Sequence, residues 1–294
     1  MTGRPTTRSS AASPIDGLAV NTLTIWWDGE ADGPTNMAAD ECLAAEAERR
    51  GSLVLRFYGW SDTTVSLGGF QRIGDARQVE AIRGVPLVRR PSGGGAIVHG
   101  SDLTYAAAVP KSHPWGASPQ VFYDALHGAM VEVLAELGIP AWPHPAGGST
   151  AVSSRNRAPA VAADRPSHDE PQFFCFDRRA SGDLVMAGPA EGTSSKIMGS
   201  AQRRLASVVL QHGSLLLRRN TTVGSLACHP AVADLVVGIA VPDEAVMSRA
   251  WGRRIARGLG ATLREEDAPF LRGRESEVAA QASRFREEWW TARR

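Results

Sequence analysis

The sequence predicts an α+β fold in which mixed, largely antiparallel sheets pack against helices. Short stretches rich in alternating apolar residues occur in runs, which is the pattern of half-buried strands. Longer stretches with apolar residues at helical spacing precede and follow those runs. Strands in runs with helices on either side favour a sheet layered with helices. The strands are expected at 23–28, 53–58, 63–67, 103–109, 173–176, 183–186, 194–199 and 208–217, and the helices at 36–46, 76–83, 121–137, 242–259 and 275–290. Residues 86–90 lead into a glycine-rich loop.

The predicted helix at 36–46 shows how these elements are identified. It is rich in alanine, and Thr35 or Asn36 is the expected N-cap. Helical spacing places Asp40 on one face with Met37 and Ala44, so a carboxylate projects beside core residues. Three short strands at 173–199 are expected to form an antiparallel meander.

The bulk composition bounds the class of protein. A chain of 294 residues can bury one large core, and 43% hydrophobic with 21% charged residues is ordinary for a soluble globular protein. A net charge of +1 argues against nucleic-acid binding by bulk charge. We find no run of about eighteen apolar residues, so no membrane span is expected.

Two segments differ in composition from the rest. Residues 1–20 are rich in Thr, Ser, Arg and Pro without an apolar signal core, which predicts a disordered N-terminus. Residues 146–171 are small, polar and dotted with proline, which predicts a flexible insertion. We therefore expect a single domain at 21–294 that carries this insertion.

The cysteines and lysines are few. Cys42, Cys175 and Cys228 are widely spaced and odd in number, which suits neither a disulfide framework nor a C-x-x-C metal site. A reducing cytoplasm is the expected compartment. Lys111 and Lys196 are the lysines, against thirty arginines. A lysine in such a chain either marks chemistry that arginine cannot perform or reflects codon usage.

The stretch Arg89-Arg90-Pro91-Ser92-Gly93-Gly94-Gly95-Ala96-Ile97-Val98-His99 is the most informative part of the chain. Consecutive glycines allow positive φ and close approach to a ligand. The flanking arginines and histidine are groups that bind carboxylate, phosphate or carbonyl oxygens. A tight hairpin with a bulge is the competing interpretation. The stretch matches neither a dinucleotide fingerprint nor a Walker loop.

Two further residues are candidates for chemistry. On a strand, Cys175 would share a face with Asp177 while Phe174 and Phe176 face the other way. A nearby cation would make such a thiol a nucleophile, and the alternative is a core cysteine. Lys196 follows a glycine-containing turn and could reach a carbonyl oxygen, or it is a solvated strand-edge lysine.

The histidines are ambiguous from the sequence. His99 and His212 have helpful neighbours, yet most such residues are turn or core histidines. Cys228-His229-Pro230 looks like a Cys-His pair, but adjacent strand residues point to opposite faces. We interpret that segment as a loop.

Seven motifs occur in one order between about residues 23 and 290 and together resemble the lipoate-protein ligase A and octanoyltransferase family, which is related to biotin-protein ligases. They are Asn36-Met37-Ala38-Ala39-Asp40-Glu41, Arg56-Phe57-Tyr58-Gly59-Trp60, Val65-Ser66-Leu67-Gly68-Gly69-Phe70-Gln71, the Arg89–His99 stretch, Leu103-Thr104-Tyr105, Lys196-Ile197-Met198-Gly199-Ser200-Ala201-Gln202-Arg203-Arg204 and Gln211-His212-Gly213-Ser214-Leu215-Leu216. The resemblance implies a biotin/lipoate protein ligase-like catalytic domain with an acyl-binding tunnel.

The resemblance also implies roles for residues. Catalysis would fall to Cys175, which resembles the nucleophile of the cysteine-dependent octanoyltransferase branch, and to Lys196, which would contact the acyl carbonyl. The implied substrate-binding residues are Arg90, Ser92, Gly93, Gly94, Gly95, His99, Gly199 and Ser200. No metal ligand is implied.

Three activities remain open at this stage. The expected one moves an octanoyl or lipoyl group from acyl carrier protein, through a cysteine thioester, to a lysine of a lipoyl-carrier domain. That domain would belong to glycine cleavage H protein or to a 2-oxoacid dehydrogenase E2. This transfer needs no cofactor. An ATP- and Mg-dependent lipoate-protein ligase is the alternative, which the Ser92-Gly93-Gly94-Gly95 form of the loop favours, and a non-catalytic binder of lipoyl domains is the third.

Overall fold

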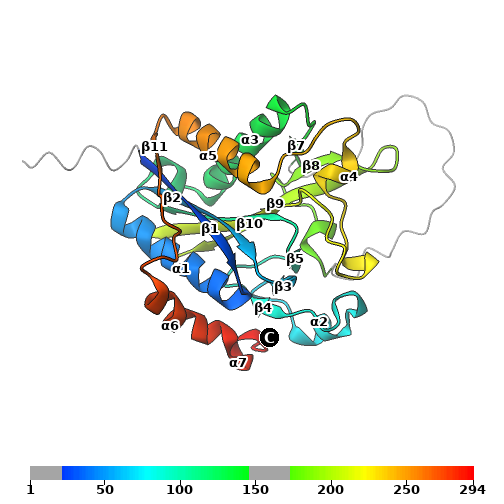
Figure 1. The fold of residues 1–294 in the computed structure, drawn as a ribbon, viewed down its shortest axis with the longest axis horizontal. Helices are drawn as coiled ribbons and strands as arrows, with labels where there is room; N and C mark the ends of the chain where they lie inside the picture. Colours follow the sequence, from blue (N-terminus) through cyan, green and yellow to red (C-terminus); the bar gives the residue numbers. More distant parts are fainter. Residues whose placement is uncertain (1–21, 146–172) are drawn as a thin grey trace, which may run out of the picture.

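The computed structural model describes residues 22–145 and 173–294, and its centre is a mixed eight-stranded sheet (Figure 1). The predictions for 1–20 and 146–171 lie outside the described residues. The order of the strands in this sheet is β11-β1-β2-β6-β10-β9-β8-β7. Its strands are β1 (Thr22–Ala31), β2 (Leu53–Trp60), β6 (Leu103–Pro110), β7 (Trp142–Pro143), β8 (Leu184–Ala187), β9 (Ser194–Arg204), β10 (Val208–Leu215) and β11 (Thr262–Glu265).

The sheet is parallel on one side and antiparallel over the rest. β1 pairs in parallel with β11 and β2, and α1 (Gly33–Arg50) makes the crossover between β1 and β2. All pairs from β2 to β7 are antiparallel. A second sheet of three strands has the order β4 (Leu87–Arg89), β3 (Thr64–Leu67) and β5 (Ile97–His99). The predicted fold class is thus confirmed.

Helices cover both faces of the large sheet (Figure 1). On one face lie α3 (Pro119–Glu136) and α5 (Glu244–Leu259), and Trp251 of α5 packs edge-on against Tyr105 of β6 at 4.7 Å between ring centroids. On the other face lie α1, α6 (Glu275–Arg286) and α7 (Glu288–Thr291). The shorter helices are α2 (Ile73–Gln78), η1 (Glu80–Ile82), η2 (Pro114–Gly116), η3 (Cys175–Asp177), η4 (Ser225–Ala227) and α4 (Val232–Leu235).

The predicted N-cap of α1 is wrong. The helix begins three residues earlier, after Asp32, whose carboxylate accepts the backbone N–H of Thr35 at 2.9 Å. Pro34 lies in the first turn, where its fixed φ suits a helix and its missing N–H costs nothing. The alanine pattern therefore identifies the helix but not its start.

The structure differs from the predicted elements at three further places. The predicted helix at 76–83 is two short elements, because Val79 is extended between α2 (Ile73–Gln78) and η1 (Glu80–Ile82). The segment 173–176 is not a strand, because Cys175–Asp177 forms a 3-10 turn and Phe174 makes a single bridge to Ala96. The predicted helix at 275–290 is two helices, since Glu287 adopts an extended conformation between α6 and α7. Among the described helices, none has the length and apolar character needed to cross a membrane.

Candidate active site

The centre of the site is a contact between Lys196 and Cys175. Lys196 is the third residue of β9, and Cys175 begins the turn η3. The ammonium Nζ lies 3.4 Å from Cys175 Sγ and 3.3 Å from Cys175 O. It also lies 5.5 Å from the centre of the Phe176 ring. A cation at this distance can stabilise negative charge that develops on or beside the sulfur during a reaction.

Lys196 is held by a buried carboxylate. Its Nζ lies 2.8 Å from Oδ2 of Asp183, and both side chains are almost completely buried. Asp183 also accepts hydrogen bonds from the hydroxyl of Tyr123 at 2.7 Å and from the backbone N–H of Ala180 at 2.6 Å. These partners fix the carboxylate, and through it the ammonium.

Gly199 provides the space that the Lys196 side chain needs. A Cβ at Gly199 would overlap Lys196 Cε and would stand 2.6 Å from Nζ. Any larger residue would therefore displace the ammonium from its place between Asp183 and Cys175. This is the physical reason for a glycine three residues after the lysine.

The glycine loop packs directly against the turn that carries Cys175. A Cβ at Gly95 would stand 2.8 Å from Cys175 N and 3.0 Å from its Cα. Ala96 donates its N–H to Phe173 O at 3.0 Å and accepts the N–H of Cys175 at 2.8 Å. The loop and the turn are thus one unit, although about eighty residues separate them in sequence.

Arg90 stabilises the loop from within. Its Nη2 donates to Gly93 O at 2.9 Å and to Gly95 O at 2.6 Å, while Nη1 donates to Ser66 O at 2.8 Å. Burial lowers the pKa of Arg90 to about 10, and it remains a cation at neutral pH. Gly94, between the two carbonyls, has φ of 94°, which a residue with a side chain rarely adopts.

Two Ser-His-Asp hydrogen-bond chains support the loop. In the first, Ser92 Oγ bonds to Nε2 of His212, whose Nδ1 lies 2.9 Å from Asp40 Oδ2. Asp40 also accepts from Arg56 at 3.1 Å and from Tyr58 at 3.1 Å. Asp40, whose carboxylate was predicted to project beside core residues, therefore orients His212.

The second chain runs from Ser66 through His99 to Asp102. Ser66 Oγ lies 2.8 Å from His99 Nε2, and His99 Nδ1 lies 2.9 Å from Asp102 Oδ2. The ring of His99 also stacks on Trp60 at 4.0 Å between centroids. Burial alone would raise the pKa of Asp102, but His99 and hydroxyl donors outweigh it and lower that pKa.

Ser200 joins the site to the core under α3. Its hydroxyl bonds to the hydroxyl of Tyr105 at 2.6 Å and to Nε2 of His127 at 2.7 Å. Nδ1 of His127 bonds to Gly182 O at 2.8 Å, next to Asp183. Burial lowers the pKa of His127 to about 4, so this imidazole is neutral at physiological pH.

A narrow slot of about 40 Å³ connects these groups. Aromatic and aliphatic side chains form much of its wall, and Cys175, His99 and His212 also line it. Its lining is Met37, Tyr58, Trp60, Ser66, Arg90, Gly94, Ile97, His99, Thr104, Cys175, Ser200, Ala201, His212, Gly213 and Ser214. The slot therefore sets Cys175 beside apolar side chains such as Met37, Trp60 and Ile97.

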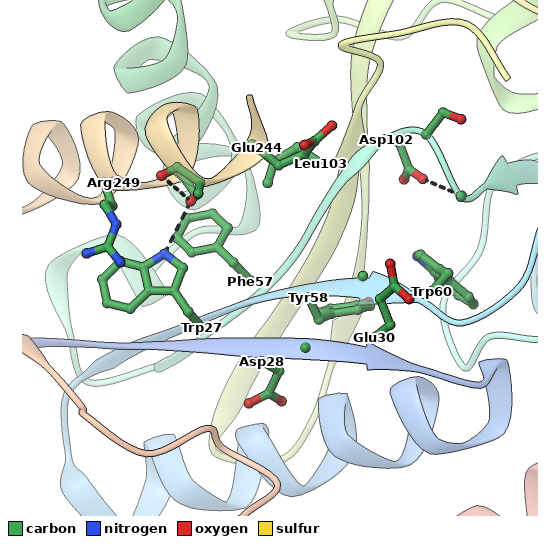
Figure 2. A pocket seen from close by; sticks show the side chains of 16 residues that line it. Trp27, Asp28, Glu30, Phe57, Tyr58, Trp60, Asp102, Leu103, Glu244 and Arg249 are labelled. Atoms are coloured by element: carbon green, nitrogen blue, oxygen red, sulfur yellow. Dashed lines mark hydrogen bonds between the residues drawn. The ribbon is translucent and has the colours of Figure 1, made fainter. Parts of the chain in front are cut away.

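A larger cavity of about 440 Å³ lies between β1, β2 and the start of α5 (Figure 2). Trp27 and Phe57 form its floor, and Trp27 Nε1 donates to Ser248 Oγ at 3.2 Å. The carboxylate of Asp28 points away from this cavity toward α1 (Figure 2), where it meets Arg56 at 2.5 Å. Tyr58 and Trp60 line both this cavity and the slot.

The structure brings the residues predicted from sequence together. Cys175 and Lys196 are in contact, Gly95 touches the cysteine turn, and Arg90, Gly94, His99 and Ser200 line the slot. Ser92 faces His212, and Gly93 lies against the ring of Phe70, so neither lines the slot. Within 22–145 and 173–294, no cluster of three or more His, Cys, Asp or Glu side chains could hold a metal ion.

Sequence reasoning missed several partners of these residues. Asp183, Ser66 and Asp102 were not singled out, although Asp183 directly precedes the strand that pairs with the strand of Lys196. A hairpin register drawn from the sequence could have placed Asp183 near the lysine. No local pattern relates Ser66 or Asp102 to His99 before the fold is known.

The comparisons with known proteins agree with this geometry. Residues 32–233, well over half of the chain, match the lipoyl protein ligase A/B catalytic domain. The chain is 36% identical over 193 residues to the octanoyltransferase LipM of Symbiobacterium thermophilum, which is 64% of this chain and 63% of that protein. It is 34% identical over 229 residues to the octanoyltransferase LipM of Moorella thermoacetica, which is 75% of this chain and 70% of that protein. The match thus covers less than two thirds of the length of the first relative and slightly more than two thirds of the length of the second.

Solved structures share the fold. A bipartite lipoate protein ligase of Thermoplasma acidophilum, described with its E2 lipoyl domain, superposes with a TM-score of 0.60 at 19% identity, over 92% of this chain and 96% of that chain. A lipoate-protein ligase A bound with ATP gives a TM-score of 0.61 at 20% identity, over 92% and 98%. The matched motifs, the fold and the extent of the family match agree, and the chain belongs to the lipoyl protein ligase A/B catalytic domain family.

Proposed function

We propose that this protein is an octanoyltransferase that moves an octanoyl group from acyl carrier protein to a lysine of a lipoyl-carrier domain, through a thioester on Cys175. The observation that carries the proposal is the 3.4 Å contact between Lys196 Nζ and Cys175 Sγ. A ligase that works through an acyl adenylate needs no thiol at this place. The octanoyltransferase names of the relatives support the same activity.

The first half-reaction loads the enzyme. Cys175 sulfur, as a thiolate that has given its proton to solvent, attacks the carbonyl carbon of the donor thioester, the C–S bond to the carrier breaks, and the carrier leaves as a thiolate that takes a proton from solvent. The Lys196 ammonium, 3.4 Å from the sulfur, stabilises the negative oxygen of the tetrahedral intermediate. Exchange of one thioester for another requires no ATP.

In the second half-reaction an acceptor lysine attacks the Cys175 thioester. The new bond is an amide, the sulfur leaves as a thiolate beside Lys196, and the overall step runs downhill. In this scheme the acyl tail lies in the slot against Met37, Tyr58 and Trp60. The glycine loop forms the wall nearest the reacting carbonyl, because Gly95 touches the Cys175 backbone.

The partners follow from the chemistry. Acyl carrier protein is the donor, and the acceptor is a lipoyl-carrier domain of glycine cleavage H protein or of a 2-oxoacid dehydrogenase E2. The structurally similar lipoate protein ligase of T. acidophilum is described with its E2 lipoyl domain, which supports an acceptor of that class. We propose a cytoplasmic location, which suits the free thiols of Cys42, Cys175 and Cys228.

Intact-mass measurement after incubation with octanoyl-acyl carrier protein tests the proposal. We expect an octanoyl adduct on the wild type and on Cys228→Ala, and none on Cys175→Ala. Transfer to a lipoyl domain should be lost in Cys175→Ala while the folded state is retained. An adduct that survives in Cys175→Ala would overturn the proposal.

The same protein samples also test the two alternatives, an ATP-dependent ligase and a non-catalytic binder. The Ser92-Gly93-Gly94-Gly95 loop resembles the ligase form, and a ligase would make octanoyl adenylate from octanoate, ATP and Mg without an adduct on Cys175. A non-catalytic binder would give neither adduct nor adenylate. Formation of adenylate is followed as release of pyrophosphate.

A further inference from the structure

The side chain of Gln71 joins the glycine turn after β3 to the segment that leads into Cys175. Its Oε1 accepts the backbone N–H of Gly68 at 2.9 Å, and its Nε2 donates to Phe173 O at 2.9 Å. Phe173 lies two residues before Cys175. Because a backbone N–H only donates and a carbonyl only accepts, these two partners leave one orientation for the amide. Both ends of a single side chain are thus in use, one on each segment.

The hydrogen bonds that hold the cysteine turn come from two places. The turn η3 has no side-chain cap at Phe174. Ala96 donates its N–H to Phe173 O at 3.0 Å and accepts the N–H of Cys175 at 2.8 Å. Both of these bonds lie at one residue, so they constrain the tilt of the turn less than a contact elsewhere does. The amide of Gln71 supplies that contact, and together with the Ala96 N–H it fills both lone pairs of Phe173 O.

A buried arginine holds Gln71 itself in place. Arg89 is completely buried, and its Nη1 donates to Gln71 O at 2.7 Å and to Gly68 O at 2.8 Å. Its Nε donates to Thr291 O at 2.8 Å, in the last helix of the chain. The glycine turn, β4 and α7 therefore form one support, and the amide of Gln71 extends that support to the cysteine turn.

The sulfur of Cys175 needs a fixed position because its cationic partner is fixed. Lys196 Nζ lies 3.4 Å from the sulfur and 2.8 Å from Asp183 Oδ2, which holds it from the other side. A turn that tilts away would leave the ammonium behind. In a positioned active site, a displacement of about 1 Å can slow the reaction about a hundredfold.

We propose that Gln71 is a positioning residue for Cys175, which holds the sulfur at its place beside Lys196 through the carbonyl of Phe173. This inference rests on the proposed function. Gln71 is not among the residues that line the slot, so an effect of its replacement on the reaction passes through the cysteine turn. The hydrogen bond to Phe173 O is the part of Gln71 that carries this role.

Single-turnover loading with octanoyl-acyl carrier protein, followed by intact mass, measures the role of Gln71. Gln71→Met keeps the length of the side chain and removes both hydrogen bonds. We expect its maximal loading rate to fall about tenfold or more, while the donor concentration that gives half of that rate stays near the wild-type value. Gln78→Met, which replaces an exposed glutamine of α2, is the matched control and should load as wild type does.

Gln71→Glu separates the bond to Phe173 from the bond to Gly68. An ionised carboxylate still accepts the Gly68 N–H but has no proton to donate to Phe173 O, so at pH 8 loading should be as slow as in Gln71→Met. A protonated carboxyl donates again. Relative to wild type, loading by Gln71→Glu should therefore recover as the pH falls toward the pKa of the new glutamate, ordinarily about 4.3, and loading by Gln71→Met should not.

Wild-type maximal rates in both Gln71 variants would overturn the inference, as would a loss in Gln71→Glu that a lower pH does not relieve. Circular dichroism at each pH shows whether the variants are folded, and if Gln71→Met does not fold, the pH dependence of Gln71→Glu decides. If wild-type enzyme forms no thioester, the proposed function itself fails. Alkylation of Cys175 by iodoacetamide then provides the test, because it should be severalfold slower in Gln71→Met than in wild type, and equal rates would contradict the role of Gln71.

Discussion

Asp183 and Lys196 form an ion pair at 2.8 Å in which both side chains are almost completely buried. Removal of one member of such a pair leaves an uncompensated charge in the interior, whereas removal of both does not. The pair thus provides a stability test that is independent of the reaction.

We predict that Lys196→Met lowers the free energy of unfolding by about 3–5 kcal/mol, because Asp183 loses its cation. The double variant Lys196→Met/Asp183→Asn should be more stable than the single variant, since no buried charge remains. Urea unfolding gives both values. Equal stability of the single and double variants would contradict a buried ion pair, and both should fail to form the thioester.

The close approach of the glycine loop to the cysteine turn predicts a contrast between two glycines. Gly95→Ala would place a Cβ within 3.0 Å of three backbone atoms of Phe174 and Cys175, which cannot move aside cheaply. We expect a loss of about 1–3 kcal/mol in stability and a clear loss of transferase activity.

Gly93→Ala is the matched control for that contrast. Its Cβ would meet only ring atoms of Phe70 at 3.6 Å, an ordinary contact. Activity and urea midpoint should stay near the wild type. A tolerant Gly95 together with a sensitive Gly93 would show that the loop lies differently against the turn.

Gly199→Ala should impair activity more than stability. The new methyl group would occupy the place of Lys196 Cε and Nζ, and a flexible lysine end can move away at a small energetic cost. The ammonium would then leave Cys175. Loading with octanoyl-acyl carrier protein should fall by about tenfold or more, which corresponds to about 1.4 kcal/mol. Gly128→Ala, whose Cβ meets nothing within 4 Å inside α3, should retain full activity and gain up to about 1 kcal/mol in stability.

His127 predicts a dependence of stability on pH. Burial lowers its pKa from 6.5 to about 4 in the folded protein, so between these values the unfolded chain binds the proton more strongly. The contribution is complete above about pH 6.5 and is lost as the pH falls toward 4, by about 3 kcal/mol in total. The loss between pH 7.5 and 4.5 in urea unfolding should be smaller for His127→Gln than for wild type. Identical losses would mean that His127 accepts a proton in the folded state.

Local patterns were sufficient for most elements and for the fold class. The strands and helices on both sides of the central sheet follow apolar alternation or helical spacing, which are properties of adjacent residues. The segment 173–176 was predicted wrongly because its aromatic residues pack against Ala96 and His229 instead of pairing along a strand. Tertiary contacts decide the conformation there.

The candidate site was predictable where it coincides with motifs and not where it depends on distant partners. Motifs led to Cys175, Lys196 and the glycine loop. His229 was assigned to a loop and set aside, because the sequence does not show that the fold returns this loop to the cysteine turn. The Ser92–His212–Asp40 chain joins three separate elements, and no spacing in the sequence relates them.

The turn that carries Cys175 is fastened by residues far upstream. The backbone of Ala96 donates to Phe173 O and accepts from the N–H of Cys175. The side chain of Gln71 also donates to Phe173 O, at 2.9 Å. The position of the sulfur is therefore independent of how many residues the chain uses to travel from β7 to Phe173. We therefore expect a shortened or lengthened connection between β7 and Phe173 to leave the reactive geometry unchanged.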